Sequence, residues 1–364
     1  MRKKQGIFGA VLLGFLGTII LAGGLIRLTT DDRKDSSGGS SGSSLPGVSD
    51  STSSTDPVFD PYEGVSGNRT ILHYDVAEEN LTVSFKVGAE VERVVFSSSN
   101  EEEYIYEAHQ DVTEAGTIEY TFETPGGKQV ELFGLESIVE RAFFDEKRLT
   151  YASFGNGVES IGKYAFHGSD MLSQVFFSNT INAIGYGAFL KSGITNIDIP
   201  DSVTTIERQA FMYCYSAHTV RIGAGVTEIP TSAFAYATGV TSLTIGENVE
   251  TIGSTAFGGY KALTELVIPD SVKTISNSAF SNSDHIETLT IGSSVESIGE
   301  SAFTSFLKVK TVYCRSEIPP TVAENVFIGW SSIQTIYVPS ETAKTAYQAA
   351  NGWSAFSNKI FVTA

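Results

Sequence analysis

Two stretches of the chain read almost alike: residues 268–280 are IPDSVKTISNSAF and residues 199–211 are IPDSVTTIERQAF. The Ala-Phe pair that ends each stretch recurs between residues 142 and 303. The phenylalanines of this series are Phe143, Phe166, Phe189, Phe211, Phe234, Phe257, Phe280 and Phe303. The steps are 23 residues, except for one of 22 before Phe211, and a weaker copy, Val326-Phe327, follows after 24. Such a fixed period predicts a solenoid of stacked coils.

The apolar residues inside each unit also repeat. Counted from its Phe as position 0, the unit of Phe257 has apolar residues at +6, +9, +11, +15 and +18, namely Leu263, Leu266, Ile268, Val272 and Ile275. Positions +9 and +11 share one face of a short strand, because side chains alternate along a strand. One coil cannot cover its own apolar residues, so we expect neighbouring coils to bury them, with each Phe filling the wide side of its coil.

These positions carry a resemblance to a known family. The unit LTELVIPDSVKTISNSAF, residues 263–280, resembles the BspA-like type of leucine-rich repeat, which reads roughly LxxLxIPxxVxxIGxxAFxxC. The resemblance covers 136–339 in eight to nine units of about 23 residues and implies a mainly β solenoid. The stretch YVPSETAKTAYQAANGWSAF, residues 337–356, resembles the family's closing segment. This implies a C-terminal cap at 340–364, with a helix that ends near Asn351-Gly352 and with Trp353 and Phe356 against the last coil. Members are typically bacterial cell-surface or secreted proteins implicated in adhesion.

A candidate binding surface follows from the strand alternation. If +9 and +11 point inward, then +8 and +10 point outward, and solenoids usually bind through such an extended face. Aromatic and Arg side chains are the types that anchor interfaces. The candidate residues in these two columns are Phe176, Asp198, Arg221, Glu265, Tyr313 and Tyr337. Asp198 is counted one position back, because its unit is one residue short. The alternative is that Thr, Tyr and Val in these columns merely suit exposed strands.

Charge and motifs exclude several other functions. The chain carries 42 acidic and 24 basic residues, a net charge of −18, which does not favour a nucleic-acid partner. The five histidines share no repeat position, and the one GxSxG stretch, at 38–42, lies in a Ser/Gly-rich segment rather than between a strand and a helix. We therefore predict no enzyme activity, no cofactor and no metal site. Cys214 and Cys314 lie about four coils apart, too far for a disulfide, so we expect two free thiols.

The N-terminal segment, residues 1–28, has the features of a membrane anchor. Three basic residues precede an uncharged stretch from Gln5 to Ile26, which is long enough to span a bilayer as a helix. A basic end stays cytoplasmic, so the rest of the chain would be extracellular. The alternative is a cleaved signal peptide, which would make the protein secreted. Residues 29–57 are rich in Ser and Gly and predict a flexible linker.

The middle module, residues 58–135, lacks the repeat. It contains short stretches of alternating polar and apolar residues, such as LTVSFKV at 81–87, between turn-forming residues. This pattern predicts six or so antiparallel strands. The length favours a small immunoglobulin-like sandwich, and a β cap on the solenoid is the alternative.

Together these features indicate a membrane-anchored surface protein that binds an extracellular protein or glycan. A second hypothesis is a structural scaffold that self-associates, with the anchor helices pairing through the small residues Ala10, Gly14, Thr18 and Ala22. A third is an accessory module for cell-wall polysaccharide. The sequence does not identify the ligand.

Overall fold

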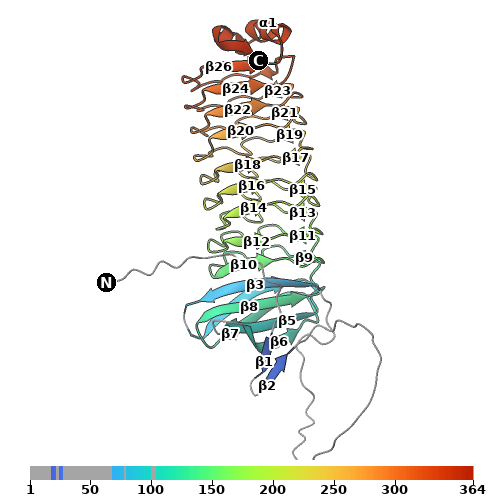
Figure 1. Cartoon of the computed structure of the whole chain (residues 1–364). Helices are drawn as coiled ribbons and strands as arrows, with labels where there is room; N and C mark the ends of the chain where they lie inside the picture. The colour runs from blue at the N-terminus through green and yellow to red at the C-terminus, as the bar shows by residue number, and fades with distance from the viewer. Residues whose placement is uncertain (1–17, 22–23, 28–67, 78, 100–103, 364) are drawn as a thin grey trace, which may run out of the picture.

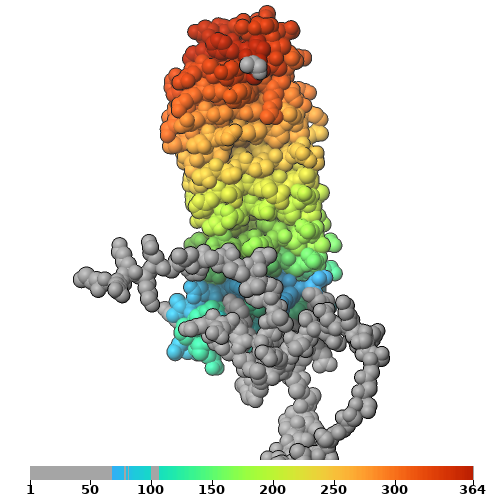
Figure 2. All heavy atoms as spheres, in the orientation of Figure 1, coloured from blue at the N-terminus to red at the C-terminus, as the bar shows by residue number. Residues whose placement is uncertain are grey.

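The chain folds into a solenoid with a β module at one end and a helical cap at the other (Figure 1). The computed structural model describes residues 18–21, 24–27, 68–77, 79–99 and 104–363. The space-filling view shows the coils as one column that runs away from the module (Figure 2). The eight to nine coils predicted from the Ala-Phe period are present, and the C-terminal strand β27 (Ile360–Val362) adds one more rung.

Each coil contributes one strand to each of two sides of the column. The longer strands are β10 (Leu149–Ser153), β12 (Gln174–Phe176), β14 (Asn196–Asp198), β16 (Thr219–Arg221), β18 (Ser242–Thr244), β20 (Glu265–Val267), β22 (Thr288–Ile291), β24 (Thr311–Cys314) and β26 (Thr335–Val338). The two-residue strands are β9 (Ser137–Ile138), β11 (Ser160–Ile161), β13 (Ala183–Ile184), β15 (Thr205–Ile206), β17 (Glu228–Ile229), β19 (Thr251–Ile252), β21 (Thr274–Ile275), β23 (Ser297–Ile298) and β25 (Thr321–Val322). Pairing within each set is parallel and keeps equivalent repeat positions side by side, as in Ile252↔Ile275.

A ladder of phenylalanine rings runs through the core. The eight repeat phenylalanines, Phe143 to Phe303, stack on one another with ring centroids 5.0–5.8 Å apart and planes within 2–22° of parallel. Each of them is at most 2% exposed. The aliphatic residues predicted at +6, +9, +11, +15 and +18 are buried beside the ladder, as Leu263 to Ile275 show. Burial of every coil therefore depends on the next one.

Two columns of left-handed backbone flank the ladder, at positions −2 and +2. In the −2 column the φ angle is positive at Arg141, Tyr164, Gly187, Gln209, Ser232, Thr255, Ser278, Ser301 and Asn325. Non-glycine residues adopt this conformation at a cost of about 1–2 kcal/mol each. Hydrogen bonds between coils hold it: the Thr255 N–H donates to the Asn277 carbonyl at 3.1 Å, and the Phe257 N–H donates to the Ala279 carbonyl at 2.8 Å.

The middle module is a two-layered β structure. Its strands are β3 (Arg69–Val76), β4 (Leu81–Val87), β5 (Arg93–Ser99), β6 (Tyr104–Asp111), β7 (Gly116–Phe122) and β8 (Gly126–Phe133). One layer has the order β3-β8-β5-β6, and the other is the antiparallel pair β4-β7. This second layer has two described strands, whereas the smaller sheet of an immunoglobulin constant domain has three. The buried aromatic residues Phe96 and Phe122 lie 6.3 Å apart between the layers.

The module also caps the first coil. Strand β3 pairs antiparallel with β10, so the module's larger sheet continues into the solenoid as β12-β10-β3-β8-β5-β6. On the other layer, Phe85 of β4 stacks on Phe143 at 5.4 Å and extends the phenylalanine ladder by one ring. The Lys86 N–H donates to the Ala142 carbonyl at 3.2 Å. The structure thus combines both arrangements that the sequence left open, a sandwich and a cap. The boundary between residues 135 and 136 stays a prediction.

The C-terminal end is closed by helix α1 (Glu341–Ala349) and the 3-10 helix η1 (Trp353–Lys359). The Ser340 hydroxyl caps α1 by accepting a hydrogen bond from the Ala343 N–H, which satisfies a backbone donor at the first turn. The fully buried Trp353 packs on Phe327 at 4.8 Å, and its indole N–H donates to the Pro320 carbonyl at 3.0 Å. Both residues expected against the last coil, Trp353 and Phe356, lie there.

The N-terminal segment differs from the predicted helix where it is described. Residues Thr18–Leu21 and Gly24–Arg27 are strands β1 and β2, paired antiparallel with Thr18 opposite Arg27. Their β-branched Thr and Ile residues favour a strand over a helix. The rest of 1–28 and the linker at 29–57 lie outside the described residues. Among the residues that are described, no helix is long and apolar enough to cross a membrane.

The two thiols are free and buried, as predicted. Cys314 occupies the +11 core column, between Ile291 on β22 and the following coil. Cys214 lies at +3, where its thiol donates to the Phe189 carbonyl at 3.3 Å. Burial raises the pKa of each thiol to about 12.

Candidate binding surface

The outward side of the longer strands forms one continuous surface, here called the strand face and defined by positions +8 and +10 of β10 to β26. In β12, β14, β16 and β20 the middle residue is buried and its two neighbours are exposed. The alternation predicted from the repeat is therefore present. All six candidate residues, Phe176, Asp198, Arg221, Glu265, Tyr313 and Tyr337, belong to this face.

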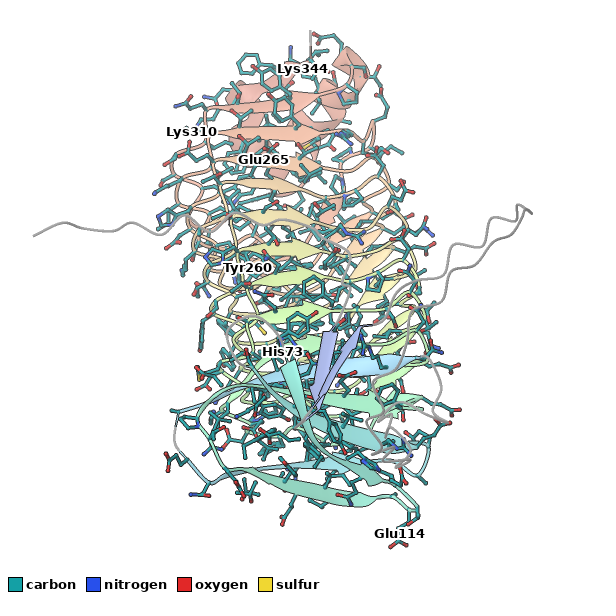
Figure 3. All side chains as sticks on the ribbon, turned by 60° about the horizontal axis from the view of Figure 1, so that its bottom comes forward. His73, Glu114, Tyr260, Glu265, Lys310 and Lys344 are labelled. Carbon is teal, nitrogen blue, oxygen red and sulfur yellow. The ribbon has the colours of Figure 1, made fainter. Side chains whose placement is uncertain are left out.

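An aromatic group lies at the N-terminal end of the strand face. Tyr151 of β10 lies between two rings: His73 of β3 stacks on it at 4.4 Å, and Phe176 of β12 lies 5.5 Å away. The Phe176 side chain is 53% exposed. Burial lowers the pKa of His73, which keeps its ring neutral near pH 7, and Gln129 holds that ring through a 3.1 Å hydrogen bond. Figure 3 places His73 where the module meets the first coils.

The middle of the strand face is polar and internally paired. The Arg221 guanidinium bonds to Asp198 on the neighbouring strand and lies 3.5 Å from Asp201. This pairing raises the pKa of Arg221. On the same two strands, the Thr219 hydroxyl donates to Asn196 at 2.9 Å. Arg221 is thus already engaged by two carboxylates, so a partner meets an ion pair here rather than a free guanidinium.

Glu265 of β20 lies two strands further along the strand face than Arg221 of β16, and it is exposed. Its neighbour at +10, Val267, is 38% exposed, and the next residue in that column, Thr290, is almost covered. Thr290 lies in register with Tyr313 of the following strand. Figure 3 shows Glu265 and Lys310 on the C-terminal half of the column, and Lys310 pairs with Glu287 at 2.8 Å at the edge of the face.

A second aromatic group lies at the C-terminal end. Tyr313 and Tyr337 stack with centroids 5.3 Å apart, and Phe361 of β27 lies in register beside Tyr337. Tyr313 is 38% exposed and Phe361 is 45% exposed. A shallow hollow of about 420 Å³ lies against this group. Its lining residues are Thr290, Tyr313, Cys314, Arg315, Tyr337, Pro339 and Thr363. Arg315 is held at the rim by Asp270 at 3.2 Å.

Two residues of this surface do not follow from the repeat. His73 joins the strand face because β3 pairs with β10, and Phe361 joins it because β27 pairs with β26. Both strands lie outside the 23-residue period, and long-range pairing has no local sequence signal. The Asp198–Arg221 pair did have one, because the two residues occupy the same column in adjacent units and carry opposite charges.

The arrangement of parallel ladders and a phenylalanine core defines a leucine-rich-repeat solenoid. A profile of the BspA type Leucine rich repeat region, in six copies, matches residues 136–246 and 227–358. The matched segment makes up more than half of the 364 residues. The chain therefore belongs to the BspA-type leucine-rich-repeat family, as the repeat unit predicted.

Several solved bacterial structures are similar to this chain. A leucine rich cell surface protein from Faecalibacterium prausnitzii A2-165 is 20% identical, over 57% of this chain and 65% of that protein, with a TM-score of 0.36. The pneumococcal vaccine antigen PcpA is 21% identical, over 64% and 72%, with a TM-score of 0.35. A leucine-rich repeat protein from Eubacterium ventriosum is 22% identical, over 56% and 70%, with a TM-score of 0.34. The chain thus spans less than two thirds of the F. prausnitzii protein. No curated protein matched.

The strand face offers aromatic, polar and charged groups for recognition. Solenoids of this kind are typically non-catalytic scaffolds for binding. Within the part of the chain that the structure describes, no group of three or more His, Cys, Asp or Glu side chains is placed to hold a metal ion. What the strand face does offer is exposed rings at both ends and a paired, polar centre.

Proposed function

We propose that this protein is a non-catalytic surface protein that adheres to an extracellular protein through its strand face. The observation that carries the proposal is the placement of the two aromatic groups at opposite ends of the strand face. Exposed Tyr and Phe side chains lose little conformational entropy on binding and bury a large area, so they anchor interfaces. A protein partner that spans the strand face would contact both aromatic groups and the polar centre between them.

A glycan partner and self-association are the competing outcomes. A short glycan would bind in the hollow beside Tyr313 and Tyr337 without contacting Phe176, which lies at the other end of the strand face. Self-association would appear without any foreign ligand. The pattern of dependence on the two ends therefore separates these partners.

The test is binding of the full-length chain to a panel of extracellular-matrix proteins, to glycans and to itself. Two variants remove one anchor each: Phe176→Ala, and Tyr313→Ala with Tyr337→Ala. We expect each to weaken binding of the same protein ligand by about tenfold or more, which is 1.4 kcal/mol or more. The control is Met171→Ala, which removes an exposed apolar side chain that lies outside the two strand-face columns. Binding unaffected by all of these changes would refute a site on the strand face.

We also propose that residues 1–28 hold the protein at a membrane with the solenoid outside the cell. The support is the length of the uncharged stretch after a basic start. The full-length chain should remain with membranes after washing in high salt or at alkaline pH, and a chain that starts at residue 29 should be released. Recovery of the full-length protein without residues 1–28 in the culture medium would instead identify a cleaved signal peptide.

A further inference from the structure

A cluster of aromatic and basic side chains lies on the turn segments of the first three coils, away from the strand face. We call it the turn cage and define it by Arg141, Phe144, Lys163, Tyr164, His167 and Tyr186. These residues occupy positions −3, −2 and +1 of their units, so none of them belongs to the +8 and +10 columns. The repeat does not require aromatic residues here, because later units place Ser, Thr and Ala at the same positions.

The Tyr164 ring lies at the centre of the turn cage. It is perpendicular to three neighbouring rings: Phe144 at 6.4 Å, His167 at 5.6 Å and Tyr186 at 5.3 Å, with interplanar angles of 89–90°. Phe144 and His167 stack in parallel at 4.7 Å. Phe144, Tyr164 and Tyr186 come from three successive coils, so the rings follow the axis of the column.

The backbone provides a seat for the Tyr164 ring. Gly187 of the next coil has a φ angle of 57°, and a Cβ atom there would lie 2.7 Å from the ring. The ring can therefore pack along the surface only because position 187 has no side chain. A second seat follows at Gly259, where a Cβ atom would lie 2.8 Å from the Tyr236 ring, and Tyr236 stacks on Tyr213 at 5.1 Å. Flat rings thus continue along the turn side.

Two exposed cations flank the central ring. The Arg141 guanidinium lies 4.7 Å from the Phe144 ring and 5.8 Å from Tyr164, and the Lys163 ammonium lies 5.5 Å from Tyr164 and 5.8 Å from Tyr186. Within the described residues, neither cation has a carboxylate within 4 Å, although the chain has a net charge of −18. The nearby Asp145 carboxylate forms an ion pair with the Lys147 ammonium at 2.8 Å.

We propose that the turn cage binds an anionic glycan that carries carboxylate groups. A pyranose ring would lie on the face of Tyr164, because its C–H bonds meet the negative face of an aromatic ring. Its carboxylate would pair with Arg141 and Lys163, and Arg binds a carboxylate through two parallel hydrogen bonds. A glycan chain along the column would then meet rings on successive coils.

Other occupants fit this surface less well. A quaternary ammonium ligand carries the same charge as Arg141 and Lys163, so these two cations beside the Tyr164 ring would repel it. An acidic peptide would satisfy the two cations but has no flat C–H face for Tyr164. The glycan proposal does not depend on the strand face, so the two proposals can fail separately.

The experiment measures binding of the full-length chain to immobilised polygalacturonate, to the same polymer with its carboxylates methyl-esterified, and to poly-glutamate. We expect binding to polygalacturonate that weakens as salt is raised, and little binding to the esterified polymer. Tyr164→Ala should weaken it by about tenfold, as should Arg141→Gln with Lys163→Gln, while Tyr164→Phe should retain it. The matched charge control is Lys273→Gln with Lys310→Gln, two exposed lysines outside the turn cage, which should leave binding unchanged.

Thermal unfolding of every variant checks that the coils remain folded. Tyr313→Ala with Tyr337→Ala should leave polygalacturonate binding unchanged, which separates the turn cage from the strand face. The proposal is overturned if the chain does not bind polygalacturonate. It is equally overturned if the esterified polymer binds as well, or if poly-glutamate binds as tightly and is insensitive to Tyr164→Ala.

Discussion

Two of the solenoid's sets of aromatic rings differ in regularity: one lies inside the coils, and the other lies on the strand face. The inner set repeats at every coil, from Phe143 to Phe303, and each ring is buried between two others. The outer set occurs only at the ends of the face, as His73, Tyr151 and Phe176 at one end and Tyr313, Tyr337 and Phe361 at the other. From Phe166 to Phe280, each inner ring stacks on the equivalent ring of the coil on either side. The outer rings each have a different set of neighbours.

This difference separates the aromatic residues that the fold requires from those that the proposed binding would use. A column that every coil needs for burial must be kept in every unit, so its regularity is a consequence of stacking. Stacking makes no such demand on an exposed column, and most positions in the two strand-face columns are polar, eight of the 18 being Thr or Ser. Rings that interrupt an otherwise polar column therefore need another reason, and binding is the one that their exposure supports.

The largest expected effect comes from breaking the inner ladder. Phe234→Ala should lower the free energy of unfolding by about 3–5 kcal/mol, because it leaves a cavity between Phe211 and Phe257. The matched control is Phe176→Ala on the strand face, where the same deletion should change stability by less than about 0.5 kcal/mol. Urea denaturation of both variants measures the contrast. Equal losses would mean that the outer rings are structural too.

The second largest expected effect is a loss of folding stability at alkaline pH. Burial raises the pKa of Cys214 and Cys314 to about 12, so above about pH 9 the unfolded chain loses thiol protons that the folded chain keeps. Stability is therefore complete below the unfolded pKa and falls as pH rises, by about 1.4 kcal/mol per pH unit for each thiol.

The check is the pH dependence of urea denaturation between pH 8.5 and 10, with Cys214→Ser and Cys314→Val combined as the comparison. Serine occurs naturally at the same +3 position in Ser192, and valine restores a core aliphatic residue at +11. The double variant should lose much less stability over this range. An unchanged slope would show that the thiols are not protected by burial.

The repeat explains why most of the fold was predictable from sequence. A 23-residue period fixes which positions face inward, so the inward-facing positions assigned in one coil apply to every coil. The docking of the module was not predictable in the same way. Phe85 joins the phenylalanine ladder and β3 joins the strand sheet through contacts between segments that share no period. The alternation within LTVSFKV predicts a strand, but it cannot indicate what that strand will pack against.

The candidate surface was predictable to a similar degree. Exposure of the +8 and +10 columns followed from alternation, but the state of each side chain depends on its neighbours. Arg221 shows this limit: as a residue type it suggested an anchor, and the structure pairs it with Asp198 and Asp201. The turn cage was not predictable from the repeat, because its residues occupy positions with no repeat consensus.

A smaller effect is expected from the backbone columns that flank the inner ladder. Thr255 is β-branched and has a φ angle of 56°, whereas Asn occurs naturally at the same −2 position as Asn325. Thr255→Asn should therefore raise the free energy of unfolding by about 0.5–1 kcal/mol, because Asn tolerates left-handed backbone. Thr251→Asn, four residues earlier on β19, is the control and should be destabilising, since strands disfavour Asn. If both variants were more stable than the unsubstituted protein, or if neither were, backbone strain at Thr255 would be contradicted.

The smallest change in stability should come from the outer face itself. Asp198→Asn removes one partner of an exposed ion pair, so the free energy of unfolding should change by less than about 0.5 kcal/mol. The effect on binding should be larger than the effect on stability. Because Asp198→Asn releases Arg221 from Asp198, an acidic protein ligand should bind more tightly at low salt. Glu265→Gln removes an equal charge from the same face without freeing a cation, and titration calorimetry on both variants isolates the effect of Arg221. If the two variants bind alike, Arg221 takes no part in recognition and the anchors at the two ends act alone.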